Sequence, residues 1–198
     1  MQTRVGVFVD VQNIYYSAKT VHHGKLNYRK LLDMIGRNRS LVKAVAYVIT
    51  KPDSDQRSKR FEDALQRIGY EIRVKRAKVR RTEHGSIVRG ACHVEMAVDM
   101  LAAAPKLDVA VLVSGDNELL PVVKHLQAIG CAVENVGIKK STSRELIEHS
   151  KFIELPPELI IDMVAPEKEE ESEEEEINGN LIEEDEPIEG SGMGIFSD

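Results

Sequence analysis

One stretch constrains the fold more than any other: an apolar run that ends in a short polar turn and continues as a helix. Residues 109–113 (Val-Ala-Val-Leu-Val) are all apolar, which is typical of a strand buried on both faces of a parallel sheet. Ser114-Gly115-Asp116 follows as a turn, and apolar residues then recur at helical spacing at Leu119, Val122, Val123 and Leu126. Pro121 falls near the first helical turn, where its missing N–H is tolerated.

This stretch places Asp116 at the carboxyl end of a buried strand. Open α/β sheets bind their ligands at that edge, so the position suggests a functional carboxylate. A simpler role is ordinarily favoured for an aspartate at the start of a helix, because aspartate is a common cap there. Partner carboxylates elsewhere in the chain decide between the two roles.

The rest of the chain alternates between strand-like and helix-like segments. Apolar strand patterns occur at residues 4–10, 41–49, 70–79 and 130–137, with short strands at 87–89 and 152–155. Helical patterns occur around residues 14–18, 28–35, 61–68, 94–101, 119–126 and 144–149. This alternation predicts an α/β fold, a three-layer α/β/α sandwich with a mainly parallel sheet.

Charge divides the chain into two parts. Residues 165–198 hold 14 acids and one Lys, a net charge of −13, and residues 1–164 carry a net charge of +7. We therefore expect a domain over residues 1–157 and an acidic, mostly disordered tail over 158–198. A basic domain suggests contact with nucleic acid, and the tail is expected to mask the basic surface or to bind a basic partner.

Two further patterns bear on the compartment. Apolar runs are too short to cross a bilayer, and Met1 leads directly into a strand rather than into a signal peptide. Cys92 and Cys131 lack the spacing of a metal site, which favours a reducing environment. We expect a cytoplasmic protein without membrane association.

Several carboxylates are positioned to converge. Asp10 ends the first strand, and Asp116 follows the strand at residues 109–113. The helix that precedes this later strand carries Glu95 and Asp99 on one face. Carboxylates gathered at one sheet edge repel one another unless a cation neutralises them. Oxygen ligands favour Mg²⁺ or Mn²⁺, and such a site suits phosphodiester hydrolysis.

Three motifs carry a family resemblance. They are Val-Asp-Val-Gln-Asn at 9–13, Val-Glu-Met-Ala-Val-Asp at 94–99, and Leu-Val-Ser-Gly-Asp-Asn-Glu-Leu-Leu-Pro-Val-Val at 112–123. Together, in this order and spacing, they resemble the NYN domain of the PIN-like nuclease superfamily, in particular its bacterial LabA-like branch. The resemblance covers about residues 4–155, and it implies a PIN-like α/β/α sandwich.

The resemblance implies a metal-dependent endoribonuclease that cleaves single-stranded RNA with water activated by Mg²⁺ or Mn²⁺. It implies catalytic and metal-binding roles for Asp10, Asp99 and Asp116, supported by Asn13, Ser114 and Asn117. The branch usually has Asp where this chain has His93, and Asp-Phe where it has Glu118-Leu119. His93, Glu95 and Glu118 are therefore additional candidate ligands. The alternative is a catalytically weakened NYN module that acts as an RNA-binding or regulatory protein.

Basic and hydroxyl residues are candidates for RNA contact, because phosphate contacts supply affinity that is independent of sequence. The candidates are Arg76, Lys78, Arg80, Arg81, Arg89, Lys139, Lys140, Thr142 and Ser143. The basic strand is equally consistent with an edge protected by charge against aggregation. PIN-like domains often form dimers, so the resemblance also suggests a homodimer, although the sequence shows no interface.

Overall fold

The structure is a computed structural model, and it describes residues 2–50, 56–82 and 85–162. Most of the predicted acidic tail, residues 163–198, therefore lies outside the described residues. Within the described ranges, no helix combines the length and the hydropathy needed to cross a bilayer.

Strands and helices alternate along the chain, as the sequence predicts. The strands are β1 (Arg4–Asp10), β2 (Gly24–Leu26), β3 (Ser40–Thr50), β4 (Glu71–Arg76), β5 (Lys78–Thr82), β6 (Gly85–Arg89), β7 (Val109–Val113), β8 (Ala132–Gly137), β9 (Lys151–Glu154) and β10 (Ile160–Asp162). The α-helices are α1 (Val11–His22), α2 (Tyr28–Gly36), α3 (Gln56–Ile68), α4 (His93–Ala103), α5 (Leu120–Ala128) and α6 (Arg144–His149). Short 3-10 helices are η1 (Ala104–Lys106), η2 (Asn117–Leu119), η3 (Lys139–Ser141) and η4 (Pro157–Leu159).

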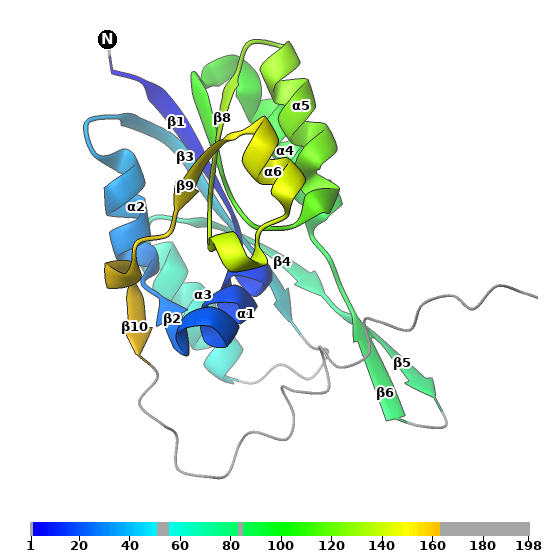
Figure 1. The fold of residues 1–198 in the computed structure, drawn as a ribbon. Helices are drawn as coiled ribbons and strands as arrows, with labels where there is room; N and C mark the ends of the chain where they lie inside the picture. Colours follow the sequence, from blue (N-terminus) through cyan, green and yellow to red (C-terminus); the bar gives the residue numbers. More distant parts are fainter. Residues whose placement is uncertain (1, 51–55, 83–84, 163–198) are drawn as a thin grey trace, which may run out of the picture.

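A six-stranded sheet in the order β4-β3-β1-β7-β8-β9 forms the middle layer, and every neighbouring pair in it is parallel. Helices cover both faces of this sheet (Figure 1). This arrangement confirms the predicted α/β fold with a mainly parallel sheet.

Two apolar cores explain why residues 5–9 of β1 and residues 109–113 of β7 are apolar without interruption. Val7 and Val9 of β1 pack on the face covered by α1, α2 and α3. Phe8 points to the opposite face, where it packs with residues of α4, α5 and α6. Side chains of a strand alternate between faces, so a strand covered on both faces needs apolar residues at every position. Residues 109–113 follow the same rule, as predicted.

The sheet reverses its winding direction between β1 and β7. From β1 the chain builds outward through β3 and β4, and it later returns to the other side of β1 for β7, β8 and β9. In doubly wound sheets, the crevice at this switch point, beyond the carboxyl ends of the strands, is where ligands bind. Val9 of β1 pairs with Val113 of β7, so Asp10 and the turn that starts at Ser114 emerge side by side.

Two features differ from the sequence-based expectation. The predicted strand at 70–79 is two strands, because β4 ends at Arg76 and β5 pairs only with β6 in an antiparallel hairpin. Ala77, at the break, is buried and its N–H donates to the carbonyl of Thr50. In addition, β10 pairs with β2 beyond residue 157, so the described fold continues to Asp162.

Candidate metal centre

Asp10 sits at the junction between β1 and α1. Its Oδ1 accepts a hydrogen bond from the Asn13 N–H at 3.0 Å, which caps the helix. The residue is only 5% exposed, and its second carboxylate oxygen, Oδ2, lies 3.3 Å from Nε2 of His93. One oxygen therefore holds the helix start, and the other faces the edge of the sheet.

The turn Ser114-Gly115-Asp116 is held by groups from three other parts of the chain. The Gly115 N–H donates to Oδ1 of Asn13 at 2.8 Å, and the Gly115 carbonyl accepts from the Ser143 N–H at 3.0 Å. Asn135, fully buried on β8, donates from Nδ2 to the Ser114 carbonyl at 2.7 Å. These bonds satisfy the backbone where β7 ends and fix the position of the next residue, Asp116.

Gly115 is required at this turn by a close approach of the backbone. A Cβ atom at this position would lie 2.3 Å from the Ser141 carbonyl oxygen and 2.9 Å from Cα of Thr142. Both neighbours are backbone atoms of the η3 loop, and they cannot move aside as a flexible side chain does. The glycine therefore lets the η3 loop pack directly against the turn that carries Asp116.

Asp116 combines the two roles that the sequence left open. Its Oδ1 accepts from the Glu118 N–H at 2.9 Å and so caps η2. Its Oδ2 lies 3.4 Å from Nε2 of His93. One oxygen caps the helical turn while the other faces the cluster, so capping does not exclude a functional role.

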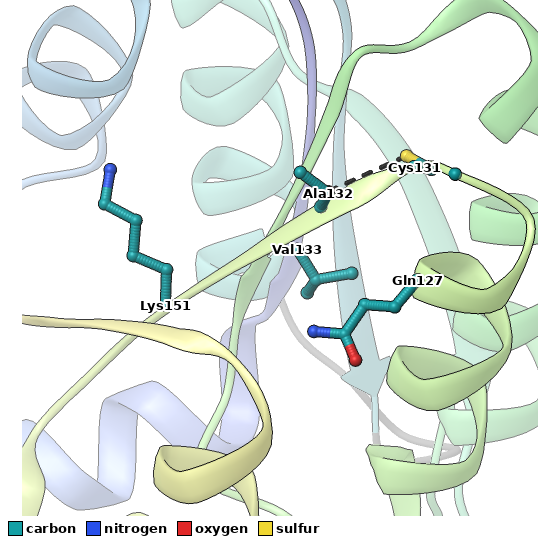
Figure 2. A pocket seen from close by; sticks show the side chains of 6 residues that line it. Gln127, Cys131, Ala132, Val133 and Lys151 are labelled. Atoms are coloured by element: carbon teal, nitrogen blue, oxygen red, sulfur yellow. Dashed lines mark hydrogen bonds between the residues drawn. The ribbon is translucent and has the colours of Figure 1, made fainter.

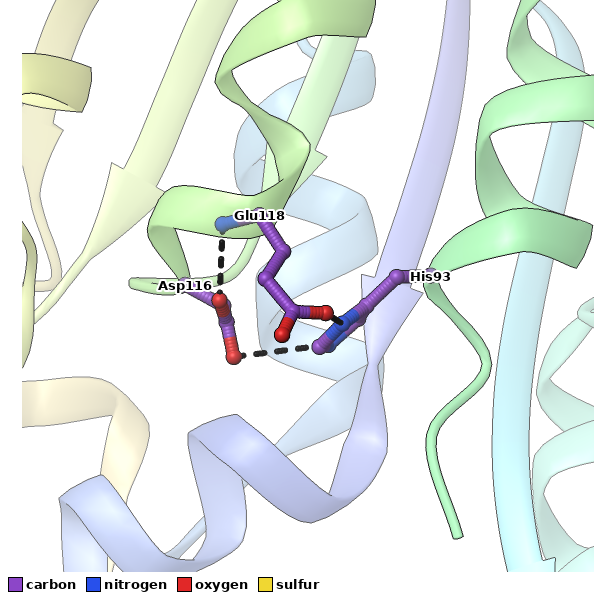
Figure 3. Close-up of side chains that lie close together, drawn as sticks. All are labelled: His93, Asp116 and Glu118. Atoms are coloured by element: carbon purple, nitrogen blue, oxygen red, sulfur yellow. Dashed lines mark hydrogen bonds and ion pairs between the residues drawn. The ribbon is translucent and has the colours of Figure 1, made fainter. Parts of the chain in front are cut away.

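His93, the first residue of α4, lies between the carboxylates of Asp10, Asp116 and Glu118, and Figure 3 shows the last two beside the imidazole. Its Nε2 faces Asp10 and Asp116, and its Nδ1 lies 2.7 Å from a carboxylate oxygen of Glu118. The hydrogen bond that the imidazole donates to Asp10 raises the pKa of His93 the most, and Glu118 and Asp116 raise it further. Together they outweigh the effect of burial and raise the pKa of His93 to about 9. In the absence of a metal, the imidazolium ion itself neutralises part of the carboxylate charge.

The donor set fits a divalent metal ion. His93, Asp116 and Glu118 each offer one ligand atom, and these atoms lie within 4.8 Å of one another. Asp10 adds a fourth donor, since its Oδ2 is close to the same imidazole nitrogen. Carboxylate oxygens suit Mg²⁺ and Mn²⁺, and imidazole nitrogen suits transition metals. The side chains that would hold the metal ion come from the end of β1, the start of α4 and the region of η2, at the switch point of the sheet.

The structure places Asp99 and Glu95 outside this cluster. Oδ2 of Asp99 accepts a hydrogen bond from the Tyr47 hydroxyl at 2.8 Å and lies 3.3 Å from Nε of Arg73. Glu95 pairs with Lys75 at 2.8 Å, which lowers its pKa. The two acids share a helix face, as their spacing predicts, but this face meets the basic strand β4.

Helix geometry explains why Asp99 does not meet Asp10 and Asp116. Six residues of α-helix separate it from His93, and they advance about 9 Å and rotate the side chain by roughly 240°. His93 therefore takes the place in the cluster that an acid from this helix was expected to fill. The sequence named His93 only as an additional candidate ligand, and its direct contact with both strand-end carboxylates comes from the fold.

The predicted RNA-contact residues fall into two groups. Lys139 and Lys140 lie exposed on η3, next to the turn that carries Asp116. Thr142 and Ser143 are structural in this geometry, because Thr142 is buried and Ser143 caps α6 and bonds Oδ1 of Asn117. The second group extends along β4, β5 and β6, where Arg76 and Lys78 are exposed and the backbone carries Arg80, Arg81 and Arg89.

A shallow hollow lies away from this centre, at the amino end of β8 (Figure 2). Gln127, Gly130, Cys131, Ala132, Val133 and Lys151 line it. Lys151 is paired with Glu134, and Gln127 donates to the His149 carbonyl. The hollow lies at the opposite end of the strands from Asp10 and Asp116, so the chemistry of the centre does not depend on it.

Comparisons with known proteins agree with the geometry. The model of the NYN domain family matches residues 4–156. Low amplitude and bright protein LabA of Synechococcus elongatus is 28% identical over 149 residues, covering 73% of this chain and 78% of that protein. A crystal structure of a protein of unknown function from Vibrio parahaemolyticus superimposes with a TM-score of 0.72 at 25% identity, covering 81% of this chain and 97% of its own. The predicted family resemblance is confirmed, and the chain belongs to the NYN domain family.

Proposed function

We propose that this protein is a metal-dependent endoribonuclease that cleaves single-stranded RNA. The observation that carries the proposal is the convergence of Asp10, Asp116 and Glu118 on His93 at the switch point of the sheet. Membership of the NYN family supports RNA as the substrate. Mg²⁺ or Mn²⁺, when bound, would supply an activated water and offset the negative charge that develops on the phosphate.

The chain's own residues have separable tasks in this proposal. Asp10 and Asp116 each direct Oδ2 toward the cluster, where it faces Nε2 of His93, because their Oδ1 atoms cap α1 and η2. This capping fixes both carboxylates without the entropy loss that mobile ligands suffer on binding. The exposed Lys139 and Lys140 lie beside the same edge and supply positive charge for the phosphate backbone of RNA.

Asp99 is not part of the centre we propose, because Tyr47 and Arg73 engage it. We assign Asn13, Ser114 and Asn117 to the support of the centre. Asn13 and Ser114 bond the turn that carries Asp116, and Oδ1 of Asn117 accepts a hydrogen bond from the hydroxyl of Ser143, the N-cap of α6.

The proposal is tested with labelled single-stranded RNA, purified protein, and Mg²⁺ or Mn²⁺ supplied separately. We expect cleavage that EDTA abolishes and that either metal restores. Cleavage that continues in EDTA would contradict the metal requirement. RNA binding without cleavage in either metal would favour the second candidate.

That second candidate is an NYN module that binds RNA without cleaving it, and one observation favours it. The protonated His93 already stands among the carboxylates as a cation, so the cluster holds together without a metal. Under this alternative the wild type binds RNA but does not cleave it. Replacement of the imidazole by a further carboxylate, His93→Asp, would then create cleavage activity.

The acidic tail supports a proposal about regulation. Residues 165–198 carry a net charge of −13 against +7 for residues 1–164. We propose that the tail competes with RNA for the basic surface or recruits a basic partner. The homodimer raised by the family resemblance stays a prediction that a measurement of mass in solution tests.

A further inference from the structure

We propose that Nε2 of His93 is a metal ligand and that this nitrogen gives the centre a preference for Mn²⁺ over Mg²⁺. In the same proposal Glu118 acts as the positioning residue that holds the imidazole, rather than as a ligand. The inference rests on the proposed metal centre and adds the identity of the metal and the source of its selectivity.

The two ring nitrogens of His93 have different surroundings. Nε2 lies 3.3 Å from Oδ2 of Asp10 and 3.4 Å from Oδ2 of Asp116, so it points to where two buried or half-buried carboxylates converge. Nδ1 lies 2.7 Å from Oε2 of Glu118, whose side chain is 73% exposed. Nε2 therefore lies beside the two carboxylate oxygens that are best fixed in position, and Nδ1 faces the single, exposed carboxylate of Glu118.

This pairing matches a recurring arrangement around protein-bound metals. A histidine ligand usually donates its second ring N–H to a carboxylate, which fixes the tautomer and the orientation of the ring. Glu118 is placed to accept that N–H, since the backbone N–H of the same residue already bonds Asp116 and fixes the start of η2. The side chain of Glu118 is exposed, but its backbone is held in place by the hydrogen bond to Asp116.

The nitrogen changes which metal the centre prefers. Mg²⁺ favours oxygen ligands, whereas imidazole suits first-row transition metals, and Mn²⁺ accepts both donor types. A centre with Asp10, Asp116 and one imidazole has two negative charges from its ligands. An aspartate in place of His93 would give three negative charges and only oxygen donors, which are the donor type that Mg²⁺ favours.

Manganese binding to the full-length chain tests the proposal without any measurement of activity. Titration followed by electron paramagnetic resonance gives the affinity for Mn²⁺, and competition with Mg²⁺ gives the ratio of the two affinities. Electron spin echo spectroscopy of bound Mn²⁺ detects coupling to a directly bonded ¹⁴N nucleus. The variants are His93→Asp, Glu118→Gln, Asp116→Asn and, as a matched control, His125→Asp on the exposed surface of α5.

We expect nitrogen coupling in the wild type and in His125→Asp, and no coupling in His93→Asp. The preference for Mn²⁺ over Mg²⁺ should fall by about tenfold in His93→Asp, and Glu118→Gln should weaken Mn²⁺ binding on the order of tenfold while keeping the coupling. Asp116→Asn should lose most Mn²⁺ binding. Circular dichroism confirms that each variant is folded before the comparison is made.

The contradicting outcomes separate this inference from the proposed function. Mn²⁺ bound to the wild type without nitrogen coupling, or an unchanged metal preference in His93→Asp, overturns the inference and leaves an oxygen-ligated nuclease centre intact. Mn²⁺ binding that Asp116→Asn leaves unaltered places the metal elsewhere and overturns both.

Discussion

The environment of His93 makes a quantitative prediction about pH and stability in the absence of metal. The folded protein holds the pKa of His93 at about 9, against an ordinary value of 6.5. Because the folded pKa is raised, the ion pairs stabilise the fold fully below pH 6.5, and this contribution disappears as the pH rises through 9. A difference of this size corresponds to about 3 kcal/mol, since each pKa unit is worth roughly 1.4 kcal/mol.

Urea denaturation in EDTA, from pH 6 to pH 10, measures this contribution when wild type is compared with His93→Gln. Glutamine retains hydrogen-bonding capacity but has no charge to lose. The stability difference between the two proteins should shrink by about 3 kcal/mol over this range, with most of the change between pH 7 and pH 10. A difference that is independent of pH would refute the assignment of a carboxylate-stabilised imidazolium.

Three further predictions concern the supports of the centre and the tail. Gly115→Ala should lower the free energy of unfolding, because its Cβ would meet the Ser141 carbonyl at 2.3 Å. Gly36→Ala should not lower it, because among the described residues no atom outside its own helix backbone and chain neighbours lies within 4 Å of the added Cβ. Thermal denaturation compares the two variants. Asn135→Leu removes the donor to the Ser114 carbonyl and should cost about 1–3 kcal/mol in urea denaturation; an unchanged midpoint would contradict this. Deletion of residues 165–198 should raise RNA affinity at low salt, and unchanged affinity in a fluorescence anisotropy titration would rule out masking.

The sequence was sufficient to predict the main features of the fold because burial on both faces leaves a direct signature. The uninterrupted apolar residues of β1 and β7 identify central strands of a parallel sheet. Short strands that form only because a partner strand lies beside them were harder to predict from the sequence. β2 and β10 are three residues each and pair only with one another, so neither carries an alternating or continuous apolar pattern long enough to recognise.

The sequence predicted the part of the candidate centre that lies at the ends of strands. It did not predict which side chains the helix α4 directs toward that part. Asp10 and Asp116 follow adjacent parallel strands, so the topology brings them together. The rotation of α4 about its axis determines which of its polar residues faces Asp10 and Asp116. Basic residues of β4 form ion pairs with the acids on the other side of α4. Lys75 and Arg73 attract Glu95 and Asp99 to the far side, which leaves His93 at the edge. Spacing alone does not contain these tertiary contacts.

We propose that the cluster around His93, and not Asp99 on the far side of α4, performs metal-dependent RNA cleavage. The most direct measurement is the rate of cleavage of labelled single-stranded RNA in Mn²⁺ by wild type, Asp116→Asn and Asp99→Asn. We expect Asp116→Asn to lose at least about a hundredfold in rate, in line with removal of a group that stabilises transition-state charge, while Asp99→Asn stays within a few fold of wild type. Equal rates for wild type and Asp116→Asn, or a collapse of activity in a folded Asp99→Asn protein, would contradict it.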